Sequence, residues 1–210
     1  MFYARTMKRT ISIVVLIFCF VPGLQAQDKK PNVVALSEPA LGERGTSRVL
    51  YWNQEKDVAV AAVTVDFGRP VWNKGYDDPV RFGLATKGKV WRLGSDYWTI
   101  LDSNVPIKMA GRDIPTGLWY LGLYRSDDGS SWSLAFIDPV KARRSRLDPF
   151  AMNTVPVEFK VPMTAEQAAG TTEKLTLSLS AQEENMKNVT LRIMWGRLQL
   201  MAPVQVLLEN

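Results

Sequence analysis

The chain has 210 residues, of which 46% are hydrophobic and 22% are charged, a composition typical of globular proteins and unlike that of disordered chains. Its formal net charge is +5, but three basic residues lie among the first 26, so residues 27–210 hold 23 basic and 21 acidic residues. This nearly neutral balance argues against nucleic acid as a partner. The sequence has no histidine and a single cysteine, Cys19, which excludes intramolecular disulfides, zinc centres and nucleophiles activated by imidazole.

Residues 1–26 are expected to be a signal peptide that is removed on export. A basic start is followed by the apolar run Ile11–Val21 and by a small residue, Ala26, at a plausible cleavage position. That run of eleven residues is too short to cross a bilayer as a helix, which takes about 20 residues. Lipid attachment at Cys19 is disfavoured because Phe18 stands where a small residue is expected. We therefore expect a periplasmic or secreted protein with no stable membrane anchor.

The remainder of the chain predicts a polar N-terminal arm, residues 27–48, followed by a single domain, residues 49–210. From position 49 the hydrophobic residues recur at every second position, the period of a strand with one buried face. Strands are predicted at residues 49–52, 58–67, 97–102, 105–109, 118–125, 131–138, 154–161, 173–180, 188–195 and 198–206. Only residues 165–169 and 140–146 look helical.

These elements predict an all-β fold, an antiparallel β-sandwich of about ten strands with one or two short helical turns. The turn residues Asp127-Asp128-Gly129 fit a hairpin between two of the strands. Trp132 and Trp195 lie on the apolar parity of their strands and are predicted to be buried. Pro156 and Pro162 cannot donate to a ladder, so they suggest a sheet edge, where a partner chain could bind.

Three motifs follow in a characteristic order: Phe67-Gly68-Arg69-Pro70, then Gly88–Ser95 with its Val90-Trp91-Arg92, then Gly111–Tyr120. In order and spacing they resemble a bacterial envelope family known as domain of unknown function 2911 (DUF2911). The resemblance covers about residues 50–200 and includes the late Trp195-Gly196. It implies a secreted β-rich fold and brings no established activity. The chain departs from the family pattern at Phe67, where a tyrosine is usual, and at Gly94–Thr99, where members usually read GANEAT.

Binding is the first functional hypothesis. Arg69 and Arg92 each stand beside a rigid residue, and a planar guanidinium suits a carboxylate or a phosphate. Together with Trp91, Asp96 and Asp66 they form the candidate binding set around one concavity. The alternative is structural, in which Arg69 pairs with Asp66 and Arg92 pairs with Asp96.

Two further hypotheses stay open. A tryptophan exposed on a sheet could stack on a sugar, the less clearly placed ones being Trp72, Trp91, Trp98 and Trp119. A hydrolase acting on glycans without histidine would need two facing carboxylates, for which Asp66 and Asp96 are candidates together with Asp102. The basic run Lys141–Arg146 reads as a solvated connection.

The sequence as a whole therefore favours an exported β-sandwich that acts by binding rather than by catalysis, with no cofactor and no metal. Its expected partner is a small ligand, a glycan or an envelope protein. The alternatives are the hydrolase and a structural or interaction protein of the cell envelope.

Overall fold

The computed structural model describes residues 33–37 and 40–208, and the predicted signal peptide lies outside the described residues. The chain divides into two units, Met1–Ala35 and Leu36–Asn210. Within the first unit only Val33–Ala35 are described, and their side chains are exposed.

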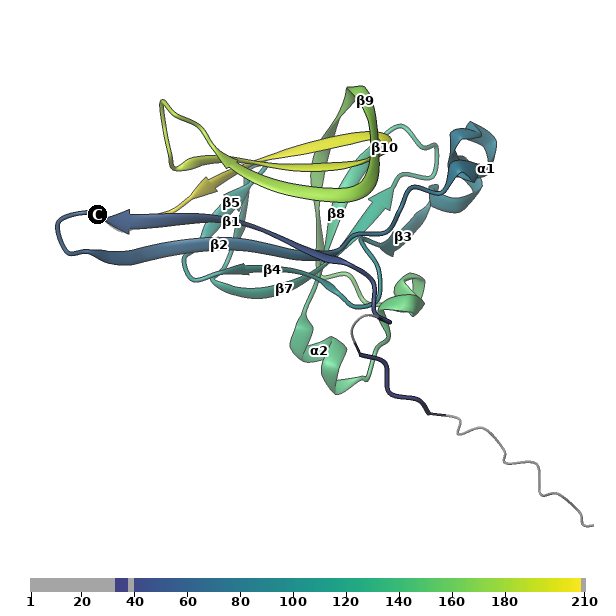
Figure 1. Cartoon of the computed structure of the whole chain (residues 1–210), viewed down its shortest axis with the longest axis horizontal. Helices are drawn as coiled ribbons and strands as arrows, with labels where there is room; N and C mark the ends of the chain where they lie inside the picture. Colours follow the sequence, from purple (N-terminus) through teal and green to yellow (C-terminus); the bar gives the residue numbers. More distant parts are fainter. Residues whose placement is uncertain (1–32, 38–39, 209–210) are drawn as a thin grey trace, which may run out of the picture. The chain divides into compact units, whose positions relative to one another are not determined.

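Ten antiparallel strands and four short helical segments make up the described part of the second unit (Figure 1). The strands are β1 (Arg44–Asn53), β2 (Val58–Gly68), β3 (Lys89–Arg92), β4 (Thr99–Ser103), β5 (Ile107–Met109), β6 (Arg112–Ile114), β7 (Gly117–Arg125), β8 (Trp132–Ile137), β9 (Phe159–Ala181) and β10 (Asn188–Val206). The helical segments are the 3-10 helices η1 (Lys74–Asp77) and η2 (Pro149–Thr154) and the α-helices α1 (Pro79–Thr86) and α2 (Pro139–Arg144). No helix in the described ranges is long and apolar enough to cross a membrane.

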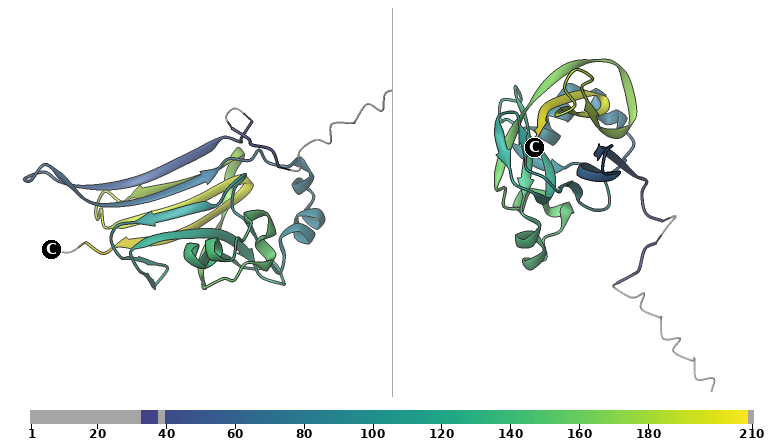
Figure 2. Two further views of the ribbon diagram at one scale, coloured as in Figure 1. Left: turned by 90° about the horizontal axis from the view of Figure 1, so that it is seen from below. Right: turned by 90° about the vertical axis from the view of Figure 1, so that its left-hand side faces the viewer.

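The strands are hydrogen-bonded in the order β1-β2-β4-β7-β8-β9-β10-β5-β6, and β3 pairs with β7 beside this path. The sheet is not closed. Instead it folds over into the two layers of a sandwich, with β5, β9 and β10 facing β1, β2, β4 and β7 (Figures 1 and 2). The predicted all-β sandwich is confirmed.

The long strand β9 joins the two layers. Its first residues pair with β8, as in Phe159 opposite Phe136, and its later residues pair with β10 from Thr164 opposite Met201 onward. Extending that second register by two residues would place Pro162 opposite Pro203, and neither residue has an N–H to donate. The ladder therefore stops there.

The predicted edge at residues 156–162 is only partly right. Pro162 does mark a place where one ladder ends, but β9 lies between β8 and β10, and the two ends of the strand order are β1 and β6. Large exposed apolar side chains gather instead on the hairpin of β1 and β2, at Leu50, Trp52, Val58 and Val60. Whether a partner chain binds this protein stays a prediction.

The core has two parts because β7 is covered on both faces. Side chains of both layers, such as Val63, Leu121 and Ile193, are less than 1% exposed and form the main core between the layers. A second cluster lies on the other face of β7 under α2 and η2, and comprises Trp98, Tyr120, Ile137, Ala142, Met152 and Val155. Burial of a side chain such as Val63, Leu121 or Ile193 stabilises the fold by about 1.5–3 kcal/mol. This agrees with the predicted strand at residues 118–125, whose sequence is apolar on both faces.

Of the two segments predicted to be helical, one is helical and the other is part of a strand. Residues 140–146 do contain α2, which begins after Asp138, whose side chain accepts hydrogen bonds from the amides of Val140 and Lys141. Residues 165–169 are not helical but part of β9. Alanine, glutamate and glutamine favour helices as isolated residues, but here Ala165 and Glu166 pair with Leu200 and Gln199 of β10, and this pairing prevails.

Candidate binding site

The family motifs meet at one end of the sandwich. A Cβ added to Gly68 would lie 2.3 Å from the carbonyl oxygen of Ser95, so only glycine lets these two backbones approach. The carbonyl of Pro70 accepts hydrogen bonds from the indole Nε1 of Trp195 at 2.9 Å and from the amide of Leu175 at 3.0 Å. Residues far apart in the sequence are thus joined mainly through backbone groups.

Arg69 has a structural role, because its side chain links the residues before β1 to β9. Its Nη1 donates to Oε1 of Glu43 at 2.5 Å, and its Nε donates to the carbonyl of Leu175 at 3.3 Å. Glu43 also accepts from Nζ of Lys174 at 2.5 Å, and this hydrogen bond is the main reason that the pKa of Glu43 lies below its ordinary value; desolvation opposes it. The predicted pairing of Arg69 with Asp66 is therefore wrong.

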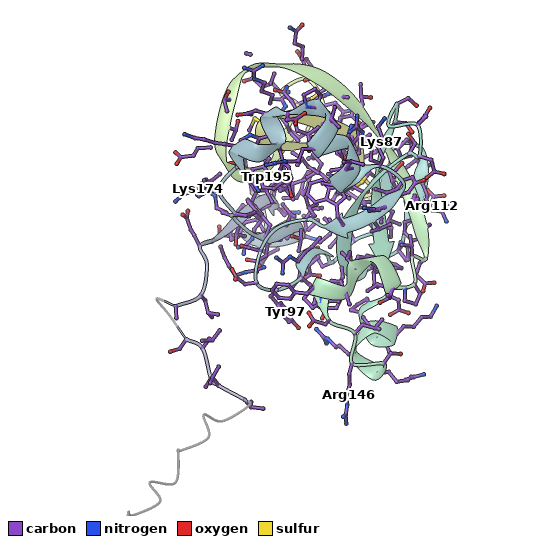
Figure 3. All side chains as sticks on the ribbon, turned by 90° about the vertical axis from the view of Figure 1, so that its right-hand side faces the viewer. Lys87, Tyr97, Arg112, Arg146, Lys174 and Trp195 are labelled. Carbon is purple, nitrogen blue, oxygen red and sulfur yellow. The ribbon has the colours of Figure 1, made fainter. Side chains whose placement is uncertain are left out.

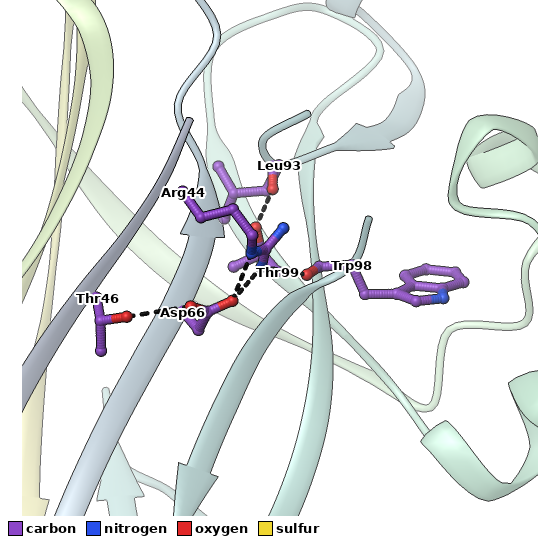
Figure 4. A network of polar contacts seen from close by, with 6 residues as sticks. All are labelled: Arg44, Thr46, Asp66, Leu93, Trp98 and Thr99. Carbon is purple, nitrogen blue, oxygen red and sulfur yellow. Dashed lines mark hydrogen bonds and ion pairs between the residues drawn. The ribbon is translucent and has the colours of Figure 1, made fainter. Parts of the chain in front are cut away.

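Asp66 is engaged elsewhere, as Figure 4 shows. Its Oδ1 accepts from Nε of Arg44 at 2.9 Å and also from Nη2 of Arg44, and its Oδ2 accepts from Oγ1 of Thr46 at 3.1 Å. Arg44 Nη2 further donates to the carbonyl of Trp98 at 3.1 Å. Both carboxylate oxygens are occupied, so this group ties β1 and β2 to the residues before β4.

Arg92 lies in a different environment, at the end of β3. Neighbouring residues on a strand point to opposite faces, so Trp91 packs into the main core while Val90 and Arg92 point toward η2. The Nε of Arg92 donates to the carbonyl of Gly94 at 3.1 Å. Its Cζ lies 3.9 Å from the ring centroid of Phe150, an arrangement that stabilises the cation.

A pocket of about 370 Å³ opens beside this guanidinium. Its lining residues are Lys89, Val90, Trp91, Arg92, Phe150 and Met152. The segment η2 can approach the sheet closely because Gly122, opposite Arg92 in β7, has no side chain; a Cβ there would lie 2.9 Å from Cε of Met152. The pocket therefore combines two cationic side chains, Lys89 and Arg92, with an apolar wall, and Nζ of Lys89 donates to the carbonyl of Leu84 at 2.9 Å.

Arg92 has hydrogen-bonding capacity that the described residues do not use. Its Nη1 is buried and has no hydrogen-bond partner among them, and the same holds for Oδ2 of Asp96. Burial lowers the pKa of Arg92, and the charges of Asp96 and Asp148 oppose this effect. The predicted pairing of Arg92 with Asp96 is thus reduced to attraction at a distance, since the ion pairs within the described ranges do not include it.

Asp96 is held in an unusual backbone conformation, with φ of +62°. A Cβ added to Gly42 would lie 2.2 Å from its Oδ2, so the residues before β1 cover this carboxylate. The structure therefore brings Arg92 and Asp96 into one neighbourhood. Arg69 and Asp66 share no hydrogen-bond partner with them among the described residues.

Most of the tryptophans are buried or half-buried. Trp132 and Trp195, 5% and 8% exposed, are buried as predicted, and Trp98 is 3% exposed. Trp91 contacts Trp132 and Trp195 with ring centroids 6.3 and 5.8 Å apart, and its Nε1 is buried without a partner among the described residues. It is therefore a core residue whose backbone strand supports the Arg92 pocket. Trp72 and Trp119 are half-buried.

Sequence reasoning missed η2, which supplies Phe150 and Met152. A signal was present, because Asp148 followed by Pro149 is typical of a helix start, and the Asp148 side chain does accept from the amide of Phe150 at 2.8 Å.

A larger pocket of about 520 Å³ lies along α1, but Lys87 is the one charged residue in its lining, so this pocket offers fewer groups to orient a ligand than the Arg92 pocket does. Within the described ranges no three acidic or thiol side chains gather as metal ligands do.

Searches of the curated proteins and of the solved structures gave no match to this chain. A family model described as "Protein of unknown function (DUF2911)" matches residues 52–204, nearly the whole of the sandwich. The resemblance carried by the motifs is confirmed, and the chain belongs to the DUF2911 family.

Proposed function

We propose that this protein is an exported, non-catalytic binding module and that the Arg92 pocket holds a small organic anion. In this proposal the carboxylate or phosphate of the ligand accepts hydrogen bonds from the guanidinium of Arg92, and an apolar or aromatic part lies against Phe150 and Met152. Export rests on the signal-like features of residues 1–26.

The observation that carries the proposal is the state of the Arg92 guanidinium. It is fixed by Gly94 and by the ring of Phe150, yet its buried Nη1 has no partner among the described residues. A buried donor without a partner costs about 1–3 kcal/mol, so a group that accepts its hydrogen bond gains that amount. A preoriented cation at the wall of an apolar pocket is what recognition of an organic anion requires.

Catalysis by paired carboxylates has less support. Asp66 uses both oxygens in hydrogen bonds to Arg44 and Thr46, and Asp96 is covered by the residues around Gly42. A general acid and a base would each need an oxygen that faces substrate. The hydrolase stays an untested alternative with no geometry in its favour.

The test is binding by the mature chain, residues 27–210, to benzoate and phenyl phosphate, with benzyl alcohol and benzylamine as neutral and cationic analogues. Calorimetry and thermal shift should detect the two anions and not the analogues, because a ligand that binds only the folded form raises its stability. Mass spectrometry of protein recovered from the periplasm or medium should show Gln27 as the first residue.

A matched pair of variants assigns the site. Arg92→Gln should weaken anion binding about tenfold or more, as expected for loss of a charge-assisted hydrogen bond. Arg112→Gln is the control, because Arg112 also lies over an aromatic ring, with Cζ 4.2 Å from the Phe159 centroid, but is not in the pocket lining. Equal binding of benzyl alcohol, or unchanged affinity in Arg92→Gln, would refute the proposal.

A further inference from the structure

A second site lies where the ladder between β9 and β10 is interrupted. The pairing is regular from Val189 opposite Ala181 to Met194 opposite Thr176. It then resumes with Gly196 opposite Thr172 and Leu198 opposite Gln167. Residues 168–171 of β9 are thus opposed by Arg197 alone, and such a bulge leaves backbone N–H and C=O groups outside the ladder.

Two adjoining pockets meet at Arg197 and together form what we call the Arg197 groove. One, of about 380 Å³, is lined by Gln167, Ala168, Gly170, Thr171 and Arg197. The other, of about 180 Å³, is lined by Trp72, Tyr76, Asp77, Phe82, Arg197 and Leu198. The groove therefore has a polar half under the bulge and an aromatic half beside η1 and α1. It shares no lining residue with the Arg92 pocket.

The aromatic half is rigidly built. The ring of Trp72 packs edge-on against Trp195, with centroids 5.0 Å apart, and against Tyr76 at 5.6 Å. Gly196 has φ of +58°, and a Cβ there would lie 2.2 Å from the indole of Trp72, so a larger residue would displace the ring. Figure 3 views this end of the molecule and shows Trp195 close to the α1 segment.

The polar groups are placed around this ring. Nε1 of Trp72 donates to Oδ1 of Asp77 at 2.9 Å, which fixes the carboxylate at the groove and leaves Oδ2 for another donor. Arg197 is exposed and lies between the two halves, and it forms no ion pair within the described ranges. The groove thus offers an aromatic surface flanked by a carboxylate, a guanidinium and the amide of Gln167.

We propose that the Arg197 groove binds a saccharide. A sugar ring has an apolar C–H face, which packs on an aromatic ring, and hydroxyls at its edge, which both donate and accept hydrogen bonds. Asp77 accepts from these hydroxyls, Arg197 donates to them, and the backbone groups of residues 168–171 do both. A carboxylate lines this groove, whereas none lines the Arg92 pocket, so the groove favours a neutral sugar over an anion, whose negative charge would face Asp77.

The experiment uses the mature chain, residues 27–210, with three soluble probes: chitotriose, cellotriose and maltotriose. Two-dimensional NMR follows the indole N–H signals, and the Trp72 signal is assigned by its loss in Trp72→Phe. We expect at least one trisaccharide to shift the Trp72 signal in a saturable way while the signals of other indoles remote from the groove stay in place.

Variants on one strand separate binding from folding. Arg197→Ala removes an exposed side chain, so it should fold normally and weaken saccharide binding about tenfold. Gln199→Ala is the control, because Gln199 lies two residues further along β10 and donates to Glu166 outside the groove. Arg92→Gln should leave saccharide binding unchanged, which makes the outcome independent of the anion site. The proposal is overturned if no probe shifts Trp72, or if Arg197→Ala binds as tightly as the unaltered protein.

Discussion

At the scale of single residues, most residues of the family motifs let separate backbone segments pack closely, and they do not present reactive side chains to solvent. Gly68 touches the backbone of Ser95, and Pro70 offers its carbonyl to Trp195. Arg69, which stands between them, fastens Glu43 to β9. The motif residue left for binding is Arg92, whose Nη1 has no partner among the described residues.

Replacing Gly68 tests this interpretation. Gly68→Ala places a Cβ 2.3 Å from a backbone oxygen, so it should lower the free energy of unfolding by about 2–4 kcal/mol. A Cβ on Gly170 would meet nothing within 4 Å, so Gly170→Ala should be neutral or stabilise by up to about 1 kcal/mol. Urea unfolding measures both, and equal effects of the two substitutions would contradict the contact.

The ion pairs of Glu43 with Arg69 and Lys174 predict that the stability of the fold depends on pH. Because its pKa is lowered by the hydrogen bond from Lys174, the carboxylate stabilises the fold above its unfolded pKa, near 4.5, and loses that contribution as the pH falls through the lower folded value. Glu43→Gln should therefore unfold at less urea than the unaltered protein at pH 7. The difference should shrink as the pH falls below 4.5. A difference that stays constant down to the acid limit of folding would exclude this linkage.

At the scale of elements, α2 and η2 matter as a cover for the outer face of β7. They bury the second hydrophobic cluster and also place Phe150 beside Arg92. The same segment thus stabilises the sheet and completes the Arg92 pocket, so a loss of packing here should affect both.

Replacing Met152 and Met186 by alanine compares the contribution of a buried methionine to stability with that of an exposed one. Met152 is 3% exposed in the second cluster, so Met152→Ala should cost about 2–5 kcal/mol of stability through lost burial and a cavity. Met186, which is 67% exposed after β9, is the matched control and should change stability by less than about 0.5 kcal/mol. Thermal and urea unfolding provide the comparison, and a Met152→Ala variant as stable as Met186→Ala would mean that η2 does not pack on the sheet.

The elements also show what sequence can and cannot predict. Apolar runs at residues 58–67 and 118–125 and alternation at residues 131–138 predict strands within a few residues of β2, β7 and β8, because each of these strands has a continuous buried face. The short strands β3 and β6 have too few residues for a period to be visible. Residues 165–169 show the opposite failure, since a partner strand far along the chain overrides local helix preference.

Site prediction had the same limit. Arg92, Trp91 and Asp96 are candidates from the sequence because their motif is local, and the structure keeps Arg92 and Asp96 near each other. Glu43, the partner of Arg69, lies 26 residues away on a segment without a periodic pattern, so nothing local indicated the pair. Phe150 and Arg197 became candidates only when the fold brought η2 to β3 and opened the bulge beside Trp72.

At the scale of the whole unit, the two layers are joined through β9 and the order of strands ends at β1 and β6. β1 pairs with β2 on one side, whereas β7 lies between β4 and β8. On its other side β1 approaches β9 through side chains, such as the hydroxyl of Ser47, which accepts from the amide of Leu179 at 2.9 Å. β1 is therefore held by a ladder on one edge only.

Hydrogen exchange should show this gradient. Amides of β1 should exchange faster than those of β7, because an end strand can open without disturbing the core whereas a covered central strand opens only with global unfolding. Hydrogen exchange followed by mass spectrometry on residues 27–210 provides the measurement. Equal protection of β1 and β7 would mean that the contact of β1 with β9 is as strong as a ladder.

The position of β10 in the sequence bears on how the molecule can be made. This strand follows every strand that it joins, pairing with β9 and with β5, which comes some eighty residues earlier. A ribosome releases it after both neighbours, so the nascent chain cannot complete the second layer until β10 has been made. If the chain is exported as proposed, this order would help to keep it unfolded for a translocase. Ending the chain before β10 should abolish cooperative folding.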